Sequence, residues 1–111
     1  MLQPLIDFRT GSKVELVIPV FNESLRLNRI INAYRNIVDI VLIDDNSTDN
    51  TIQLAQQFSI TVFRRNRDAE VKLFAPTEYP IVYYVNNISL SGKCIKIDAD
   101  ELITSRDILE I

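Results

Sequence analysis

Short apolar runs rich in β-branched residues recur along this chain of 111 residues, with stretches of helical spacing between them. Four predicted strands are built on such runs, at residues 14–20 (with the run itself at 16–18), 40–43, 60–63 and 94–97. Continuous apolar runs that lack alternating polar residues are typical of strands covered on both faces of a sheet. The sequence therefore predicts strands that must have helices packed on both of their faces.

Amphipathic segments separate the runs. Helices are expected over about residues 25–36, 52–58 and 81–88, with a further short strand at 71–74 and a last short helix near 108–109. Asn22 or Ser24 is predicted to cap the first helix. Pro19, which lacks an N–H, is predicted to end the pairing of the first strand. Crossover helices between strands imply an α/β fold with a mostly parallel sheet. We expect one domain over residues 1–111, with 1–12 as a loosely held lead-in.

Three scarce residue types narrow the chemistry. The chain has no histidine, so it contains neither an imidazole base nor a Ser-His-Asp triad. Its one cysteine, Cys94, excludes an intrachain disulfide and is interpreted as an inert core thiol. The two glycines, Gly11 and Gly92, form no glycine-rich phosphate loop. Carboxylates, hydroxyls, amides and a bound metal remain as chemical groups.

The net charge of −3 argues against nonspecific binding to nucleic acid, which needs a basic surface. The segment that comes nearest to a basic patch contains Arg64, Arg65 and Arg67. We interpret it as a solvated loop. The sequence shows neither a membrane span nor a signal peptide. The default expectation is a cytoplasmic protein, with peripheral contact at the inner face of the membrane left open.

Acidic residues follow two of the predicted strands directly. Asp44 and Asp45 come after the second run, and Asp98 and Asp100 come after the fourth. The carboxyl ends of parallel strands lie on one edge of a sheet, where ligands of open α/β sheets bind. Converging carboxylates favour a hard divalent cation, and Mg²⁺ or Mn²⁺ commonly shares its ligands between carboxylates and phosphates. An Asp-x-Asp metal site would replace the missing glycine-rich loop.

A structural interpretation stands beside this one. Asp and Asn after a strand are common in turns and helix caps. For residues 44–47 alone, the structural interpretation as a turn or cap and the functional interpretation as a site have about equal weight. Thr48 and Asp49 are interpreted as caps. Tyr83 and Tyr84 are interpreted as packing residues. Two acidic groups, each placed directly after a buried strand, shift the balance toward a functional site.

Three segments together resemble the family 2 glycosyltransferases of the GT-A fold. They are residues 17–23 (VIPVFNE), 41–51 (VLIDDNSTDNT) and 96–101 (KIDADE), in the order that the family has. The resemblance covers about residues 14–104. It implies transfer of a sugar from a nucleotide diphosphate donor, commonly with inversion, and identifies this chain with the nucleotide-binding half.

The resemblance also implies roles for individual residues. Pro19, Val20 and Glu23 would line the nucleotide pocket. Asp45 would hydrogen-bond the base with Asp44 beside it, which suits a uracil N–H and favours a UDP-sugar. Asp98 would reach the ribose or a metal-bound water, and Asp100 would bind Mn²⁺ or Mg²⁺. The acceptor would be a saccharide or a lipid-linked molecule, as in polysaccharide biosynthesis.

The match to the family is incomplete. Residues 84–89 fit its donor-binding helix only in part, and residues 68–80 have no clear counterpart. The family's general base lies well downstream on the acceptor half, and Glu101 fits the motif rather than the base. No catalytic residue is therefore assigned, and the chain alone is expected to bind nucleotide and to transfer sugar slowly or not at all.

Other functions are weighed against the transferase. A phosphoacceptor receiver domain needs an acidic pair after its first strand, where this chain has Pro-Val-Phe-Asn. A phosphatase with an Asp-x-Asp nucleophile normally carries that motif near the amino terminus. A truncated transferase that binds nucleotide without catalysis agrees with the family reading.

Overall fold

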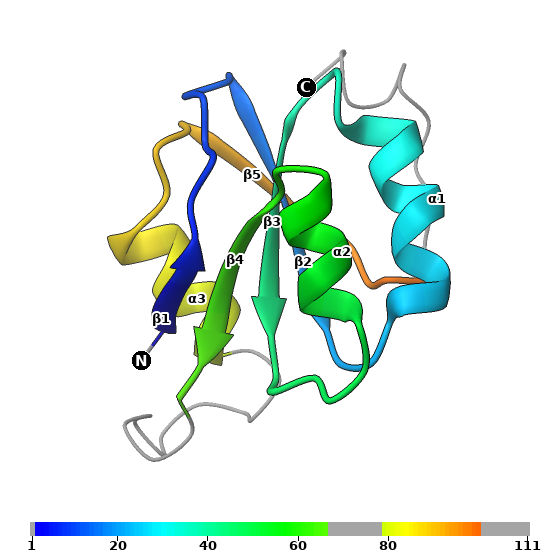
Figure 1. Ribbon diagram of the computed structural model, residues 1–111. Helices are drawn as coiled ribbons and strands as arrows, with labels where there is room; N and C mark the ends of the chain where they lie inside the picture. The colour runs from blue at the N-terminus through cyan, green and yellow to red at the C-terminus, as the bar shows by residue number, and fades with distance from the viewer. Residues whose placement is uncertain (1, 67–78, 101–111) are drawn as a thin grey trace.

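The computed structural model describes residues 2–66 and 79–100 (Figure 1). Its strands are β1 (Leu2–Ile6), β2 (Val14–Val20), β3 (Asp39–Asp44), β4 (Thr61–Arg65) and β5 (Lys93–Lys96), and its helices are α1 (Ser24–Tyr34), α2 (Thr51–Gln57) and α3 (Tyr79–Asn87). Each of the four apolar runs forms a strand, and the three helices expected between them are confirmed. The strand expected at 71–74 and the helix expected at 108–109 lie outside the described residues.

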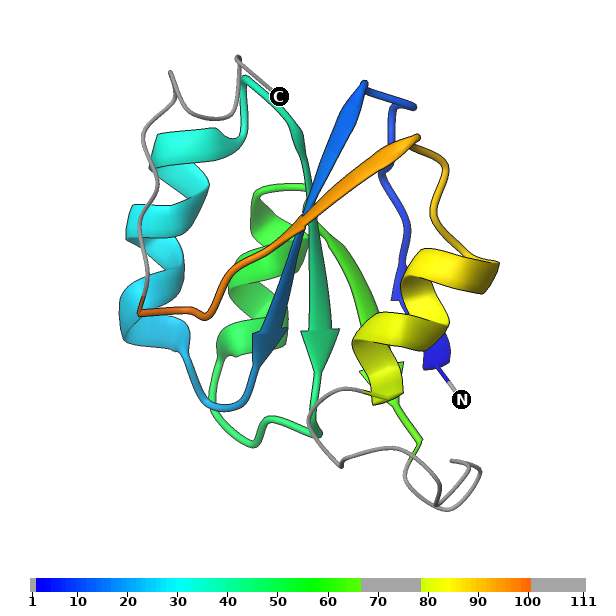
Figure 2. The ribbon, with the colours of Figure 1, turned by 180° about the vertical axis from the view of Figure 1, so that it is seen from behind.

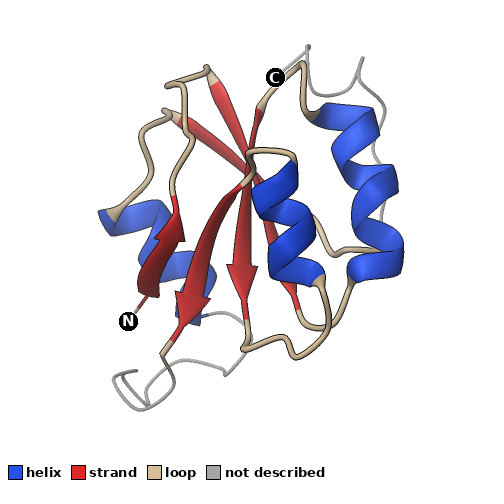
Figure 3. Ribbon diagram, in the orientation of Figure 1, coloured by secondary structure: helices blue, strands red, loops and turns tan. Residues whose placement is uncertain are grey.

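The strands form one sheet in the order β1-β4-β3-β2-β5 (Figure 3). The pairs β4·β3, β3·β2 and β2·β5 are parallel, and only the edge strand β1 is antiparallel. The chain steps outward from β2 to β4 and then returns to place β5 on the other side of β2. An α/β fold with a mostly parallel sheet is thus confirmed. Its strand order reverses between β2 and β5, where such folds bind ligands.

Helices cover both faces of the sheet, as the unbroken apolar runs predict. Helices α1 and α2 lie on one face, and α3 lies on the other, as the two opposite views show (Figures 1 and 2). Alternate residues of β2 point to the two layers. Leu16 and Ile18 join the cluster with α1 and α2, and Val17 packs with Tyr84 of α3. The interpretation of Tyr84 as a packing residue is confirmed, since it is fully buried and stacks at a tilt on Phe63.

Pro19 does not end the pairing with β3, as the sequence analysis expected. The register continues through Pro19 opposite Ile43 to the last residue of β2. The pairing with β5, in contrast, ends at Val17, whose carbonyl accepts the N–H of Ile97. Because backbone groups alternate in direction along a strand, the missing N–H of Pro19 faces the β5 side. The proline therefore opens the sheet between β2 and β5 only.

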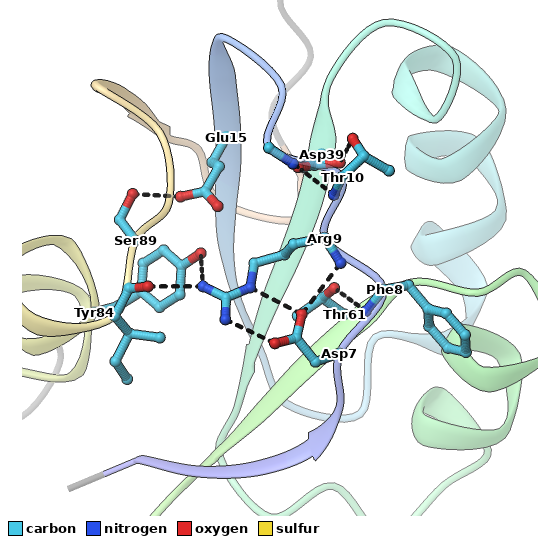
Figure 4. Close-up of polar contacts among 11 residues, drawn as sticks. Asp7, Phe8, Arg9, Thr10, Glu15, Asp39, Thr61, Tyr84 and Ser89 are labelled. Carbon is cyan, nitrogen blue, oxygen red and sulfur yellow. Dashed lines mark hydrogen bonds and ion pairs between the residues drawn. The ribbon is translucent and has the colours of Figure 1, made fainter.

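The prediction that residues 1–12 form a loosely held lead-in is wrong. Residues 2–6 pair with β4 as strand β1. The Asp39 carboxylate accepts hydrogen bonds from the backbone N–H of Thr10 at 3.0 Å, of Gly11 at 3.1 Å and of Ser12 at 3.3 Å. The Thr10 hydroxyl adds a fourth bond (Figure 4). A buried carboxylate with four donors fixes this turn at the amino edge of the sheet.

Arg9 connects the amino-terminal segment to α3 (Figure 4). Its guanidinium donates to the Ile88 carbonyl at 2.8 Å and to the Tyr84 hydroxyl at 3.4 Å, and it pairs with Asp7 at 2.7 Å. The same group lies 5.2 Å from the centre of the Phe63 ring, a favourable cation–π distance. Burial raises the pKa of Tyr84 and keeps its hydroxyl neutral. Arg9 thus holds α3 against the sheet.

Within residues 2–66 and 79–100, no helix is both long and apolar enough to cross a membrane. The cytoplasmic location expected from the sequence stays a prediction.

The Asp39 turn leads to a stability prediction. Replacing Asp39 with Asn keeps the shape but removes the charge and sets an amide donor among backbone donors. We expect the free energy of unfolding to fall by ~2 kcal/mol, a value typical of hydrogen bonds to a buried charged group. Urea denaturation followed by circular dichroism measures the loss. The same substitution at the exposed Asp100 should change stability by less than ~0.5 kcal/mol. Equal effects of the two substitutions would contradict the account of this turn.

Candidate functional site

A pocket of about 600 Å³ lies at the carboxyl edge of the sheet, on the face that α3 covers. Its lining comes from the ends of β2, β3, β4 and β5 and from the first turn of α3. The lining residues are Pro19, Val20, Phe21, Glu23, Ile43, Asp45, Arg65, Pro80, Ile81, Val82, Lys96 and Asp98. The pocket combines apolar walls with five charged side chains, which is the usual make-up of a small-molecule site.

Five of the residues predicted from the sequence meet in this pocket. Pro19, Val20 and Glu23 line it from the end of β2, Asp45 from the end of β3, and Asp98 from beyond β5. Glu23 is half-buried and pairs with Arg26 at 3.2 Å. The convergence follows from the parallel sheet, which brings the carboxyl ends of its strands to one edge.

The neighbours Asp44 and Asp45 occupy different environments. Asp45 is half-buried and lines the pocket. Asp44 does not line the pocket: its side chain is fully buried, 3.6 Å from Arg64 Nε, and accepts the backbone N–H of Ser47 at 3.1 Å. Successive residues of a strand point to opposite faces, so only one of the two reaches the pocket. Asp44 therefore stabilises the turn after β3 from the side that faces away from the pocket.

Asp98 and Asp100 are exposed, whereas the residues between and before them are buried. Ile97 and Ala99 belong to the core cluster on the α1 face. This alternation turns both aspartates away from the core, and Asp98 lines the pocket. Its carboxylate is paired with Lys96 Nζ at 2.6 Å.

The donor set suits one kind of metal site. Within the described residues, no group of three or more His, Cys, Asp or Glu side chains lies close enough to hold a metal ion. Mg²⁺ and Mn²⁺ need only one or two carboxylates when a substrate's phosphates and water supply the other ligands. Asp98 lines the pocket and Asp100 does not, so a shared site here would draw on at most these two exposed carboxylates. They do not fit a site built from protein ligands alone.

Arg65 is a pocket residue that the sequence analysis missed. Its interpretation with Arg64 as part of a solvated loop is wrong, because both residues lie in β4, and Arg65 is only 6% exposed. Arg67 lies outside the described residues. Phe63 and Arg65 lie on the same face of β4, because side chains two residues apart in a strand point to the same side. If the predicted strand at 60–63 is extended by two residues, this spacing places Arg65 on the pocket side. The charges after the apolar run concealed that extension.

The loops after β2 and β3 are joined by side-chain hydrogen bonds. Asn22 adopts a left-handed conformation (φ 51°), and its side-chain Oδ1 accepts the N–H of Thr48 at 2.7 Å and of Asp49 at 3.2 Å. The Asn22 N–H donates to the Ser47 hydroxyl at 2.9 Å, and the Glu23 N–H donates to the Thr51 hydroxyl at 3.1 Å. This network fixes two walls of the pocket relative to each other.

The same network replaces the helix caps expected from the sequence. Glu23 and Asn50 are the N-cap residues of α1 and α2, and neither makes a side-chain cap bond. The predicted caps Asn22, Ser24 and Thr48 are therefore wrong. Asp49, also predicted as a cap, bridges the helices: its carboxylate accepts the N–H of Thr51 at 2.9 Å and of Ser24 at 3.3 Å.

Cys94 lies under α3, away from the pocket lining. It is half-buried in β5, and its sulfur lies 3.2 Å from the Ser89 hydroxyl. Burial raises the pKa of the thiol, and the carboxylate of Glu15 adds to that effect. A thiol that stays protonated is a poor nucleophile, in agreement with its interpretation as an inert core residue.

The fold and the pocket together define an α/β protein with a pocket at the switch point of its sheet. The family profile described as Glycosyl transferase family 2 matches residues 15–71, just over half of the chain. The chain belongs to this family. The receiver and phosphatase hypotheses are thereby replaced.

The chain is similar to two known proteins, to one in sequence and to the other in fold. An uncharacterized glycosyltransferase of Rickettsia felis is 39% identical over 51 residues, which span 45% of this chain and 18% of that protein. The crystal structure of glucosyl-3-phosphoglycerate synthase from Mycobacterium tuberculosis matches with a TM-score of 0.68 and 21% identity, over 89% of this chain and 38% of that one. That enzyme was solved in complex with Mn²⁺, UDP and glucosyl-3-phosphoglycerate. This chain thus spans less than half the length of either protein.

Asp49 leads to a prediction about pH. Burial raises the pKa of its carboxyl, but the bonds from Thr51 and Ser24 outweigh this effect, and the pKa is lowered. A lowered folded-state pKa stabilises the protein above the unfolded pKa of about 4, and the stabilisation disappears as the pH falls through the folded value. We expect Asp49→Asn to unfold more easily than the wild type at pH 7. The difference should shrink as the pH is lowered below about 4. Urea denaturation of both proteins at several pH values measures it, and a pH-independent difference would refute the stated cause.

Proposed function

We propose that this chain is the donor-binding half of a family 2 glycosyltransferase and binds a nucleotide diphosphate sugar together with a divalent cation. The observation that carries the proposal is the pocket at the switch point, where Asp45 and Asp98 stand on either side of the end of β2. Family membership supports the same reading.

The β5 side of the pocket suits the diphosphate. In the proposal, Asp98 and Asp100 hold Mn²⁺ or Mg²⁺, with Asp98 also within reach of the ribose or a metal-bound water. When bound, the cation would neutralise negative charge on the diphosphate and on the departing nucleotide. Lys96 would leave Asp98 and turn toward the phosphates. The complex of the similar synthase with Mn²⁺ and UDP supports a site of this kind.

The β2 and β3 side suits the nucleoside. Pro19 and Val20 offer an apolar wall, and Asp45 offers an acceptor to a ring N–H of the base, which favours a UDP-sugar. Glu23 closes the pocket from the start of α1. Asp44 would act indirectly. Its carboxylate accepts the Ser47 N–H, and this bond holds the turn that positions Asp45.

Sugar transfer by the whole protein is part of the proposal as well. The acceptor would be a saccharide or a lipid-linked molecule, with contact at the inner membrane face in the second case. Inverting transfer needs a general base at the acceptor hydroxyl, and we assign that role to no described residue. The chain alone is therefore proposed to bind the donor without efficient transfer, and a nucleotide-binding role without catalysis remains the second candidate.

Calorimetric titration tests the proposal most simply. UDP, GDP and dTDP are titrated into the folded 111-residue chain with and without Mn²⁺. We expect UDP to bind, and to bind at least ~10-fold more tightly with Mn²⁺, because the cation removes repulsion between the diphosphate and the pocket carboxylates. A folded chain that binds none of the three nucleotides would refute the proposal.

Two variants separate the metal role from general effects of charge. Asp100→Ala should abolish the gain from Mn²⁺ while leaving the metal-free affinity for UDP nearly unchanged. Asp7→Ala removes the same charge at the opposite edge of the sheet and should keep the full gain. Unchanged binding of UDP and Mn²⁺ by Asp100→Ala would remove the metal role from this residue.

A further inference from the structure

We infer that a second pocket, at the amino edge of the sheet, binds an acidic sugar unit, that is, a pyranose ring that carries a carboxylate or a phosphate group. This binding goes beyond the proposed function. Only its purpose, to anchor a remote unit of a glycan acceptor, rests on that function.

The second pocket lies on the α1 and α2 face, far from the proposed donor site. Val38, Ile40 and Ile60 line it from the core cluster that packs with these helices. Its volume is about 160 Å³, whereas pockets for drug-sized ligands begin at ~300 Å³. The six residues of β3 separate the two edges of the sheet by ~20 Å. The pocket therefore suits one small ring and is too small for a nucleotide.

Two aromatic rings border this pocket. Phe58 follows the last residue of α2 and is half-buried, whereas Phe8 is 47% exposed. The N–H of Phe8 donates to the Thr61 hydroxyl at 2.9 Å, which fixes the backbone there. In Figure 4 the ring of Phe8 points away from Arg9, on the side of α2. Exposed rings beside a cavity favour a ligand with an apolar face, and the C–H groups of a pyranose form such a face.

Arg35 supplies the positive charge of the pocket. It is the C-cap residue of α1, and its guanidinium lies 5.5 Å from the centre of the Phe58 ring. Stacking on a ring leaves the N–H groups at the edge of the guanidinium available, and their fork matches a carboxylate or a phosphate. Asp39 also lines the pocket, but its charge is offset by the four bonds that it accepts from the turn at residues 10–12. An acidic group on the ligand would therefore pair with Arg35.

Polar groups around the rings suit the hydroxyls of a sugar. The Asn36 amide and the Ser59 hydroxyl line the pocket and are exposed. Among the residues that the structure describes, these two side chains and the guanidinium of Arg35 make no hydrogen bond. Helices α1 and α2 both end at this edge, so their last carbonyl groups add acceptors. A sugar hydroxyl both donates and accepts, whereas a simple anion would use Arg35 alone.

The test is a nuclear magnetic resonance titration of the ¹⁵N-labelled chain with glucuronate, glucose 6-phosphate and glucose at millimolar concentrations. We expect at least one of the two acidic sugars to shift the amides of Thr10, Arg35 and Ser59, with a Kd at least ~10-fold lower than that of glucose. Arg35→Met should weaken the binding of that acidic sugar by ~10-fold and change glucose binding little. Arg29→Met removes an exposed arginine of α1 outside the pocket and should keep the preference.

Three results would overturn the inference. The first is that neither acidic sugar shifts amides at the amino edge, and the second is that glucose binds as tightly as both of them. The third is that acetate and inorganic phosphate bind as tightly as the acidic sugars, since the sugar ring would then contribute nothing. None of these results needs a variant that might unfold.

UDP and Mn²⁺, titrated into the same samples, report separately on the donor pocket. A chain that binds UDP but no acidic sugar contradicts this inference alone. A chain that binds an acidic sugar at the amino edge but no nucleotide supports the sugar site, contradicts the proposed function and removes the anchoring purpose assigned to the site.

Discussion

The parallel pairing of β2 with β3 is the interaction on which the rest of the structure depends. All six residues of β3 are buried, as are all residues of β2 except Pro19. Two strands buried on both faces require helices on both faces, which crossover connections supply. Once those layers are packed, the polar residues that follow the central strands can reach solvent only at the edges of the sheet. The carboxyl edge therefore gathers Glu23, Asp45 and Asp98, and the amino edge is closed by the Asp39 turn.

The pocket results from the same packing. Pro19 continues the pairing with β3 while it faces the β5 side, so the sheet opens where the strand order reverses. The loops that border this opening are fixed to each other through Asn22 and Asp49. Helix α3, which supplies the opposite wall, is held at its far end by Arg9. Residues distant from the pocket thus determine its shape.

Much of this could be predicted from the sequence, because a continuous apolar run has few alternatives to a buried strand. The acidic residues after such runs then locate one edge, and Pro19, Glu23, Asp45 and Asp98 are found there. Strand β1 could not be predicted, since an edge strand with Gln3 and Pro4 carries no apolar run and is defined by its partner β4. The burial of Arg65 and the different environments of Asp44 and Asp45 depend on neighbouring strands, which single-sequence patterns do not contain.

The central claim is that the carboxyl edge of this sheet is a nucleotide site. It is tested most directly by nuclear magnetic resonance of the ¹⁵N-labelled chain titrated with UDP and Mg²⁺. The account predicts chemical-shift changes in the amides after β2, β3, β4 and β5, including Phe21, Asp45 and Asp98, with little change at Thr10 and Gly11 on the opposite edge. Shift changes centred on the Asp39 turn, or no changes at saturating UDP, would contradict it.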